Sequence, residues 1–196
     1  MSPQRVSIVS ALVALLSVQA ACDDSRLSSD PAAAVAGPQL SASPVRAMRF
    51  KGTVALVDPV DPPPAPCAAF LNSVIAGNAT HMGRFEGVGS TCITSQVAPD
   101  PDPPFEAPGP PPYATATFTN PLWVLTAAHG DELWLESSDG VAVLSLADGS
   151  LRAVGTHEII GGTGRFANAT GELTTRGVNA DGIGPDDVQS RGWISY

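Results

Sequence analysis

The sequence is poor in positive charge, in aromatic residues and in long apolar runs, and each shortage excludes a class of protein. Ten Lys and Arg stand against 19 Asp and Glu, so the formal net charge is −9 and no basic patch is present to hold nucleic acid. Lys51 is the sole lysine, which removes most lysine-based nucleophile schemes. No apolar run is long enough for a membrane span of the mature protein, and no period of about 20–50 residues marks a repeat array.

Proline is the residue in excess. The chain has 19 Pro and 19 Gly in 196 residues. Their combined share of the sequence is below the roughly 25–30% that marks a low-complexity chain. Thirteen of the 19 prolines lie in two segments, residues 59–66 and 99–112. Because proline cannot donate a hydrogen bond to a sheet, these segments break the strands around them. The composition therefore predicts one folded domain with two Pro-rich loop insertions.

The first 21 residues have the pattern of a signal peptide. Arg5 supplies a basic start, residues 6–18 are apolar, and small residues precede Cys22. The Ala-Ala-Cys sequence followed by two Asp resembles a bacterial lipoprotein processing site, in which the Cys carries the lipid. We therefore expect an exported protein that is anchored to a membrane only through lipid on Cys22. The alternative is an ordinary secretory signal cut near Ala21, which would release the protein into the periplasm or outside the cell.

The remaining chain divides into a tether and a domain. Residues 22–45 are rich in Asp, Ser, Ala and Pro, and this composition predicts a flexible tether. Residues 46–196 carry the folded domain. If Cys22 is lipidated, Cys67 and Cys92 remain as a pair in an oxidising compartment. A disulfide between them would close a loop of about 26 residues and contribute about 3–4 kcal/mol. The alternative is two buried free thiols.

The folded part has the pattern of an all-β domain without a convincing amphipathic helix. Alternating segments are separated by Gly-containing turns at 129–131, 138–140 and 148–149. Eight to ten short strands at this spacing favour one antiparallel sheet closed into a barrel, since closure removes exposed edges. A sandwich is the alternative. The expected strands cover 48–56, 79–95, 113–119, 122–128, 132–137, 141–146, 151–160, 170–176 and 192–196, and residues 67–76 suit a strand or a short helix.

Residues 159–171, Ile-Ile-Gly-Gly-Thr-Gly-Arg-Phe-Ala-Asn-Ala-Thr-Gly, resemble a motif of the allene oxide cyclase barrel-like family. Plant dirigent proteins and exported bacterial proteins of unknown role are relatives in that family. Residues 77–85, 126–133 and 192–196 look like the same bacterial group. The resemblance implies a single eight-stranded antiparallel barrel with an apolar interior. It carries over no catalytic residue, because no position matches one of the plant cyclases.

The glycines of this motif suit a structural turn. Gly161, Gly162 and Gly164 permit positive φ and close backbone approach between two strands. Phe166 can then plug the end of the barrel, and Arg165 can reach carbonyls or a carboxylate at its rim. The alternative is a phosphate-binding glycine loop, which needs a following helix. The residues from Ala167 onward have the pattern of a strand, so we favour the structural turn.

Two charged residues are the weak catalytic candidates. Arg84 and Glu86 alternate on a predicted strand, with His81 and Phe85 on the other face. Facing inward they would form a buried pair capable of acid–base chemistry. Facing outward they are solvated charges, which is the interpretation that we favour.

The three histidines do not form an obvious site. Residues 123–129, Trp-Val-Leu-Thr-Ala-Ala-His, resemble the stretch around the catalytic His of chymotrypsin-like proteases. No Gly-Asp-Ser-Gly-Gly sequence follows, and only 67 residues come after His129, so a serine protease is not expected. His81, His129 and His157 lack the close ligand pairs of zinc sites. We expect no metal and no cofactor, although three histidines could still converge inside a barrel.

Three functions remain open. The fold resemblance and the lack of a catalytic constellation favour a binding protein that holds a small apolar ligand in its barrel. A surface or interaction protein with a plugged barrel could use the Pro-rich loops for recognition. A cyclase or isomerase acting on an apolar substrate would need at least two polar groups facing an enclosed pocket.

Overall fold

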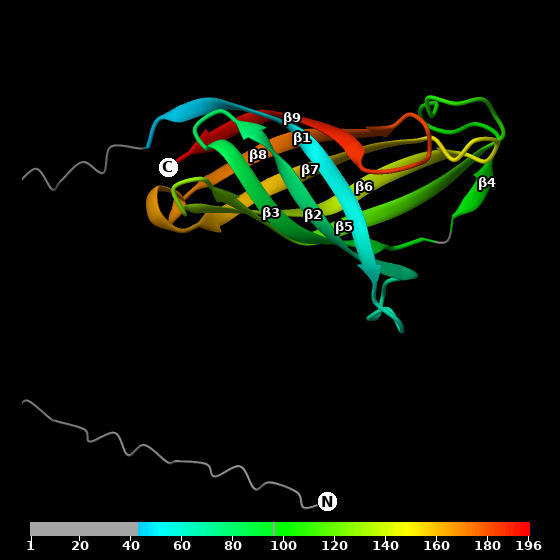
Figure 1. Cartoon of the computed structure of the whole chain (residues 1–196), viewed down its shortest axis with the longest axis horizontal. Coiled ribbons are helices and arrows are strands. Elements are labelled where there is room, and N and C mark those ends of the chain that lie inside the picture. The colour runs from blue at the N-terminus through cyan, green and yellow to red at the C-terminus, as the bar shows by residue number, and fades with distance from the viewer. Residues whose placement is uncertain (1–42, 96) are drawn as a thin grey trace, which may run out of the picture. The chain divides into compact units, whose positions relative to one another are not determined.

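The computed structural model describes residues 43–95 and 97–196. The expected signal peptide, Cys22 and the expected tether up to residue 42 lie outside the described residues. The described chain contains nine strands and one short 3-10 helix (Figure 1). These are β1 (Val45–Pro59), β2 (Ala69–Ala79), β3 (Gly83–Ile93), β4 (Ala98–Asp100), β5 (Tyr113–Ala127), β6 (Glu132–Ser145), β7 (Leu151–Gly162), η1 (Gly164–Phe166), β8 (Thr170–Asn179) and β9 (Asp186–Ser195).

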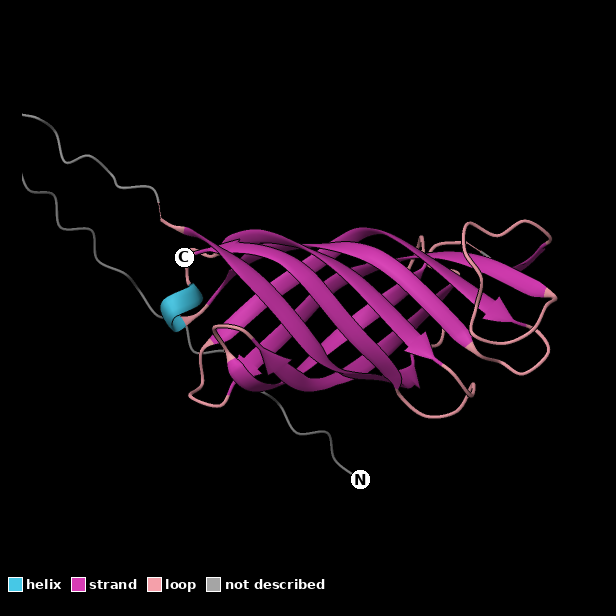
Figure 2. Cartoon of the chain, turned by 90° about the horizontal axis from the view of Figure 1, so that it is seen from above, coloured by secondary structure: helices cyan, strands magenta, loops and turns pink. Residues whose placement is uncertain are grey.

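Eight of the nine strands close into one antiparallel barrel. The strand order is β3-β2-β1-β9-β8-β7-β6-β5, and a further pairing of β3 with β5 closes the ring (Figures 1 and 2). The short strand β4 pairs with the start of β5 and takes no part in the closure. The predicted all-β, eight-stranded closed barrel is confirmed. No helix of the described chain is long and apolar enough to cross a membrane.

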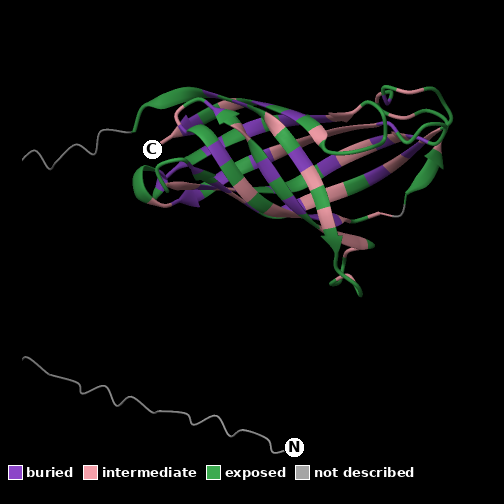
Figure 3. Cartoon of the chain, viewed as in Figure 1, coloured by how far each residue is buried: buried purple, intermediate pink, exposed green. Residues whose placement is uncertain are grey.

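Side chains alternate between the interior and the outer wall along the strands. In β8 the residues from Thr170 to Gly177 are exposed and buried in strict turn, and the same banding runs round the barrel (Figure 3). This is the period of two that a half-buried strand requires. The alternation decides which side chains face the interior.

Two expected strand breaks are wrong. Strand β5 runs through Asn120-Pro121 with a shifted register instead of ending there, and β6 runs through Ser138-Asp139-Gly140 with a bulge. Gly140 is needed for packing and not for a turn, because the Phe118 ring occupies the space that a Cβ would take. A bulge adds a residue without ending the strand, so turn-like residues are tolerated inside it.

Other strand boundaries differ from the expected ones by a few residues. The ambiguous segment 67–76 is strand, as part of β2. The strand expected at 79–95 begins at Gly83, because residues 80–82 form the β2–β3 turn with a positive φ at His81. The turns at 129–131 and 148–149 are confirmed. The strand expected at 170–176 begins at Thr170 as β8, whereas residues 167–169, whose pattern also suggested strand, belong to the connection after the 3-10 helix.

The connections define two ends of the barrel. At the closed end lie residues 80–82, 128–131 and 163–169 together with the C-terminal Tyr196. At the open end lie 60–68, 94–95, 97–112, 146–150 and 180–185. Both Pro-rich insertions therefore belong to the open end. The apolar core fills the closed half and its largest fully buried side chains are Met48, Ile75, Phe85, Leu125, Leu133, Ile159, Phe166, Leu173 and Ile194.

The two Pro-rich insertions are tied down at the open end in different ways. The expected disulfide is confirmed: Cys67 at the end of the first insertion is bonded to Cys92 of β3, with a Cα–Cα distance of 5.3 Å. The second insertion is hydrogen-bonded to the β6–β7 turn, where the Gly109 N–H donates to Ser150 Oγ at 2.8 Å. Ser145 Oγ donates to the Pro110 carbonyl at 2.6 Å. Both segments are therefore fastened to the barrel wall.

Candidate functional site

The Gly-rich motif closes one end of the barrel. Gly161 and Gly164 have φ values of 137° and 55°, which side chains rarely adopt, and the chain then turns back as the 3-10 helix (Figure 2). Phe166 is fully buried, and its ring centre lies 5.1 Å from that of Tyr196 in an edge-to-face contact. The motif forms the plug that was expected of it, and only a single 3-10 turn follows the glycines, in place of the helix that a phosphate loop needs.

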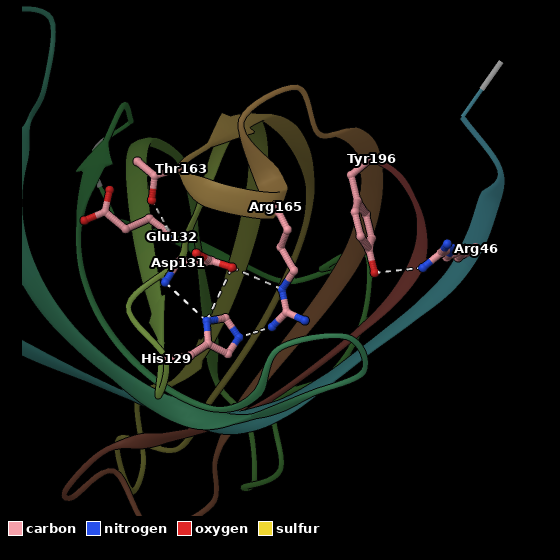
Figure 4. Close-up of polar contacts among 7 residues, drawn as sticks. All are labelled: Arg46, His129, Asp131, Glu132, Thr163, Arg165 and Tyr196. Atoms are coloured by element: carbon pink, nitrogen blue, oxygen red, sulfur yellow. Dashed lines mark hydrogen bonds and ion pairs between the residues drawn. The ribbon is translucent and has the colours of Figure 1, made fainter. Parts of the chain in front are cut away.

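Arg165 ties this plug to the rim (Figure 4). Its Nε lies 3.4 Å from a carboxylate oxygen of Asp131, and its Nη2 contacts His129 Nε2. The guanidinium also lies over the Phe166 ring, 5.0 Å from its centre. Arg165 therefore reaches a carboxylate at the rim, as expected. These polar groups are partly exposed, and their contacts join this turn to the β5–β6 turn.

His129 has no protease-like setting. It lies in the β5–β6 turn with its Nδ1 3.4 Å from Asp131 Oδ2. Within the described residues its side chain contacts Asp131 and Arg165, and no serine hydroxyl is among its hydrogen-bond partners. His81 is also at this end, where its Nε2 lies 3.0 Å from the Ala47 carbonyl oxygen. Both histidines therefore lie at the closed end of the barrel.

Arg84 and Glu86 lie on the outer wall. Their side chains are 79% and 77% exposed and 3.8 Å apart, whereas Phe85 between them is buried in the core. The outward interpretation is confirmed. Because the barrel wall separates them from the interior, the two residues form no enclosed acid–base site.

The open half of the barrel holds a cavity of about 290 Å³. Every barrel strand except β2 contributes lining residues to it. Most of the lining is apolar or glycine, including Leu56, Ile93 and Leu151. The turns at Gly149 and Gly184 stand at its mouth, and no residue of 59–66 or 99–112 is among the lining residues.

Three polar side chains face this cavity with unused hydrogen-bonding capacity. Asn120, Trp123 and His157 are only 2%, 6% and 3% exposed. Among the described residues, Asn120 Oδ1, Trp123 Nε1 and both ring nitrogens of His157 have no hydrogen-bond partner. Most buried polar atoms in proteins do find a partner. Three such residues around one cavity therefore mark it as the candidate site.

Local irregularities of the sheet position these side chains. The register of β5 against β6 shifts on both sides of Asn120, and bulges of this kind commonly aim a side chain into a site. The Asn120 Nδ2 donates to the Ser90 carbonyl at 3.2 Å and to Thr91 Oγ1 at 2.8 Å. Gly89 lies opposite Trp123, and the indole ring of Trp123 occupies the space that a Cβ on residue 89 would take. The glycine makes room for the Trp123 ring, and the bulge lets Asn120 and Trp123, three positions apart, both line the cavity.

Burial keeps the cavity free of positive charge. It lowers the pKa of His157 from 6.5 to about 4, an effect that the Asp139 carboxylate partly offsets, so the imidazole is neutral at neutral pH. Burial raises the pKa of Asp186 at the mouth, and the Asn179 side chain partly offsets that rise. None of the described residues that line the cavity is Lys or Arg. The arrangement suits an uncharged occupant.

The histidines do not converge. His157 faces the cavity from β7, while His81 and His129 belong to turns at the closed end. In residues 43–95 and 97–196, no group of three or more His, Cys, Asp or Glu is placed to hold a metal ion.

The fold and the site define a class of protein: a closed eight-stranded antiparallel β-barrel, plugged at one end, with an internal cavity at the other. Neither known protein families nor curated proteins show a significant match to the sequence. Among solved structures, a pterocarpan synthase dirigent protein is similar at 12% sequence identity. That alignment covers 81% of this chain and 88% of the other, with a TM-score of 0.28. At that score the similarity carries no argument, and the barrel assignment rests on the strand pairing.

Proposed function

We propose that this protein binds a small, mainly apolar molecule in the open-end cavity. The observation that carries the proposal is an unfilled volume of about 290 Å³ beside three buried side chains with unpartnered polar atoms. An engineered cavity of about 150 Å³ holds benzene, so this one holds a bicyclic group, and a further ring of the ligand can extend through the open mouth. The closed half is filled by side chains, so the plugged-barrel alternative describes only that half.

The same proposal includes the cellular setting. The signal-like residues 1–21 and the lipoprotein-like Cys22 support export and a lipid anchor, and the Cys67–Cys92 disulfide is typical of an oxidising compartment. The motif at 159–171 supports a distant relationship to the allene oxide cyclase barrel-like family. A lipidated Cys22 predicts that the mature chain begins there, and mass spectrometry of the N-terminal peptide tests it. A chain cut after Ala21 without lipid would contradict the anchor.

A cavity-filling variant tests ligand binding. Gly177 lines the cavity, and a Cβ there would meet Ala153 and Val188 at 3.8 Å, an ordinary contact. We expect N-phenyl-1-naphthylamine to bind the purified protein saturably, with a rise in its fluorescence, and Gly177→Leu to weaken that binding at least tenfold. Thr174→Leu is the matched control, because Thr174 points outward from the same strand. No saturable binding, or equal binding by Gly177→Leu, would overturn the proposal.

An isomerase or cyclase is the second candidate. It is favoured by His157 and Asp186, which face one cavity and whose pKa values are both moved by burial toward the neutral forms. Such groups can steer a reactive apolar substrate by proton transfer or hydrogen bonding. Turnover of a bound substrate that is lost in both His157→Gln and Asp186→Asn, with binding retained, would establish it. Binding without turnover would leave the protein a carrier.

A further inference from the structure

We infer that the inner end of the cavity recognises one uncharged polar group that both donates and accepts a hydrogen bond, such as an alcohol hydroxyl, and that it rejects carboxylates. The inference rests on the proposed function and deepens it by naming the class of ligand. That ligand is a neutral, mainly apolar molecule that carries a hydroxyl group at the end that enters first.

The unpartnered atoms offer both kinds of hydrogen bond. The Trp123 indole is a donor only, through Nε1–H. Asn120 offers an acceptor, because its Nδ2 already donates to Ser90 and Thr91, which leaves Oδ1 free. Neutral His157 supplies one donor and one acceptor. A hydroxyl can satisfy a donor and an acceptor at once, whereas a hydrocarbon would leave all of these atoms buried and unpaired.

Trp123 and His157 lie close enough to act on one group, and Asn120 lines the same cavity. The ring centres of Trp123 and His157 are 4.7 Å apart, and Asn120 and Trp123 are three positions apart across the β5 bulge. All three are more than nine-tenths buried. Their unpartnered polar atoms are therefore desolvated beside the cavity, and hydrogen bonds at desolvated positions discriminate most strongly between ligands.

Charge works against an ionised ligand. A carboxylate entering the cavity would lose its hydration without meeting a cation, since none of the described lining residues is Lys or Arg and His157 is neutral at neutral pH. Asp186 at the mouth offers a carboxylate no positive partner. An ammonium group could pair with Asp186, but the unpartnered acceptor atoms and Trp123 Nε1–H together match a group that also accepts. The structure therefore favours an alcohol over either ion.

Four probes on one scaffold test the inference: 2-methylnaphthalene, 2-naphthalenemethanol, 2-naphthoate and 2-naphthylmethylammonium, each measured by displacement of N-phenyl-1-naphthylamine at neutral pH. We expect the alcohol to bind tightest, at least tenfold more tightly than the carboxylate or the ammonium. A carboxylate, ammonium or methyl compound that binds as tightly as the alcohol would overturn the inference while leaving the proposed function intact. If the fluorescent probe itself fails to bind, the proposed function fails first.

Substitution of the donor separates recognition from packing. Trp123→Phe keeps an aromatic ring but removes Nε1–H, so we expect at least fivefold weaker binding of the alcohol and less than twofold change for 2-methylnaphthalene. Trp134→Phe is the matched control, since the Trp134 Nε1–H donates to Glu132 Oε2 outside the cavity. His157→Leu provides a second variant with the same expected selectivity. An equal loss for both probes, or no loss for either, would contradict the inference.

Discussion

The two ends of this barrel are built from the same eight strands, yet one is filled and the other is hollow. At the closed end the inward positions carry large side chains such as Phe85, Leu125 and Phe166, each at most 1% exposed. At the open end β7 and β8 place Ala153, Gly155 and Gly177 at inward positions, where little volume fills the space. The difference shows that the size of the inward-facing residues decides whether a part of this one sheet encloses a packed core or a cavity.

The difference also separates the main source of stability from the proposed binding site. Burial of apolar side chains is the main favourable term in folding, so the closed end carries most of the stability. The open end keeps unpartnered polar atoms and unfilled volume, which cost stability and are typical of binding sites. Substitutions at matched positions in the two halves should therefore have unequal effects.

The largest expected effect is a truncation in the closed core. Leu125→Ala removes a fully buried side chain from a packed region, and we expect the free energy of unfolding to fall by about 4 kcal/mol. Leu151→Ala, in the cavity wall, is the matched substitution and should cost about 1 kcal/mol, because that side chain is only half-buried. Urea denaturation of both variants measures the difference. Equal losses would mean that the two halves are packed alike.

The next effect concerns the disulfide at the open end. Reduction of Cys67–Cys92, or the double change Cys67→Ser and Cys92→Ala, releases a loop with a sequence separation of 25 residues. We expect a loss of about 3 kcal/mol, chiefly because the unfolded chain gains freedom. Thermal unfolding with and without reductant measures this loss. A reductant effect that persists in the double variant would show that the bond is not its cause.

Acid should destabilise the protein through the open end. His157 has a pKa of about 4 in the folded state and 6.5 unfolded, so below pH 6.5 the unfolded chain binds a proton that the folded chain does not. The free energy of unfolding should therefore fall by about 2 kcal/mol between pH 7 and pH 5. His157→Gln should flatten this slope. Asp186, with its raised pKa, acts in the opposite direction, so the variant comparison isolates the histidine.

The smallest effect is expected at the rim of the plug. Arg165→Ala removes the contacts with Asp131 and His129 and the stacking on Phe166, but these polar side chains are between 28% and 44% exposed. We expect a loss of about 1 kcal/mol or less in the free energy of unfolding. Ligand binding at the far end should be unchanged. A loss as large as that of Leu125→Ala would show that Arg165 holds the plug.

The sequence predicted the closed end better than the open end. Local signals placed the plug, because Gly161 and Gly164 permit the positive φ that the turn uses, and Phe166 follows them directly in the sequence. The disulfide was predictable because Cys67 and Cys92 remain as a pair if Cys22 carries lipid. Strands β5 and β6 were each divided in two, since Asn120-Pro121 and Ser138-Asp139-Gly140 have turn residues that the structure uses as bulges.

The site residues were harder to predict. Arg84 and Glu86 form a charged pair on one strand face, but an alternating pattern does not state which face turns inward. Asn120 and Trp123 come from a strand that the sequence divided between them, so their shared direction was hidden. The inward direction of His157 was predictable, because His157 alternates with Ile159, an apolar inward residue, along a strand with a clear sequence pattern.

The sequence by itself determined an all-β chain with hairpin turns, a plug motif and one cysteine pair. Turn residues, the alternation of side chains along a strand and the inability of proline to donate a hydrogen bond all act between neighbouring residues, so they can be recognised locally. Only the tertiary structure decided that Ala153, Gly155 and Gly177 meet across the interior and leave a cavity beside Asn120, Trp123 and His157. The physical reason is that the cavity is the volume left after side chains from seven strands have packed together. That volume depends on all seven strands, so no single segment of the sequence predicts it.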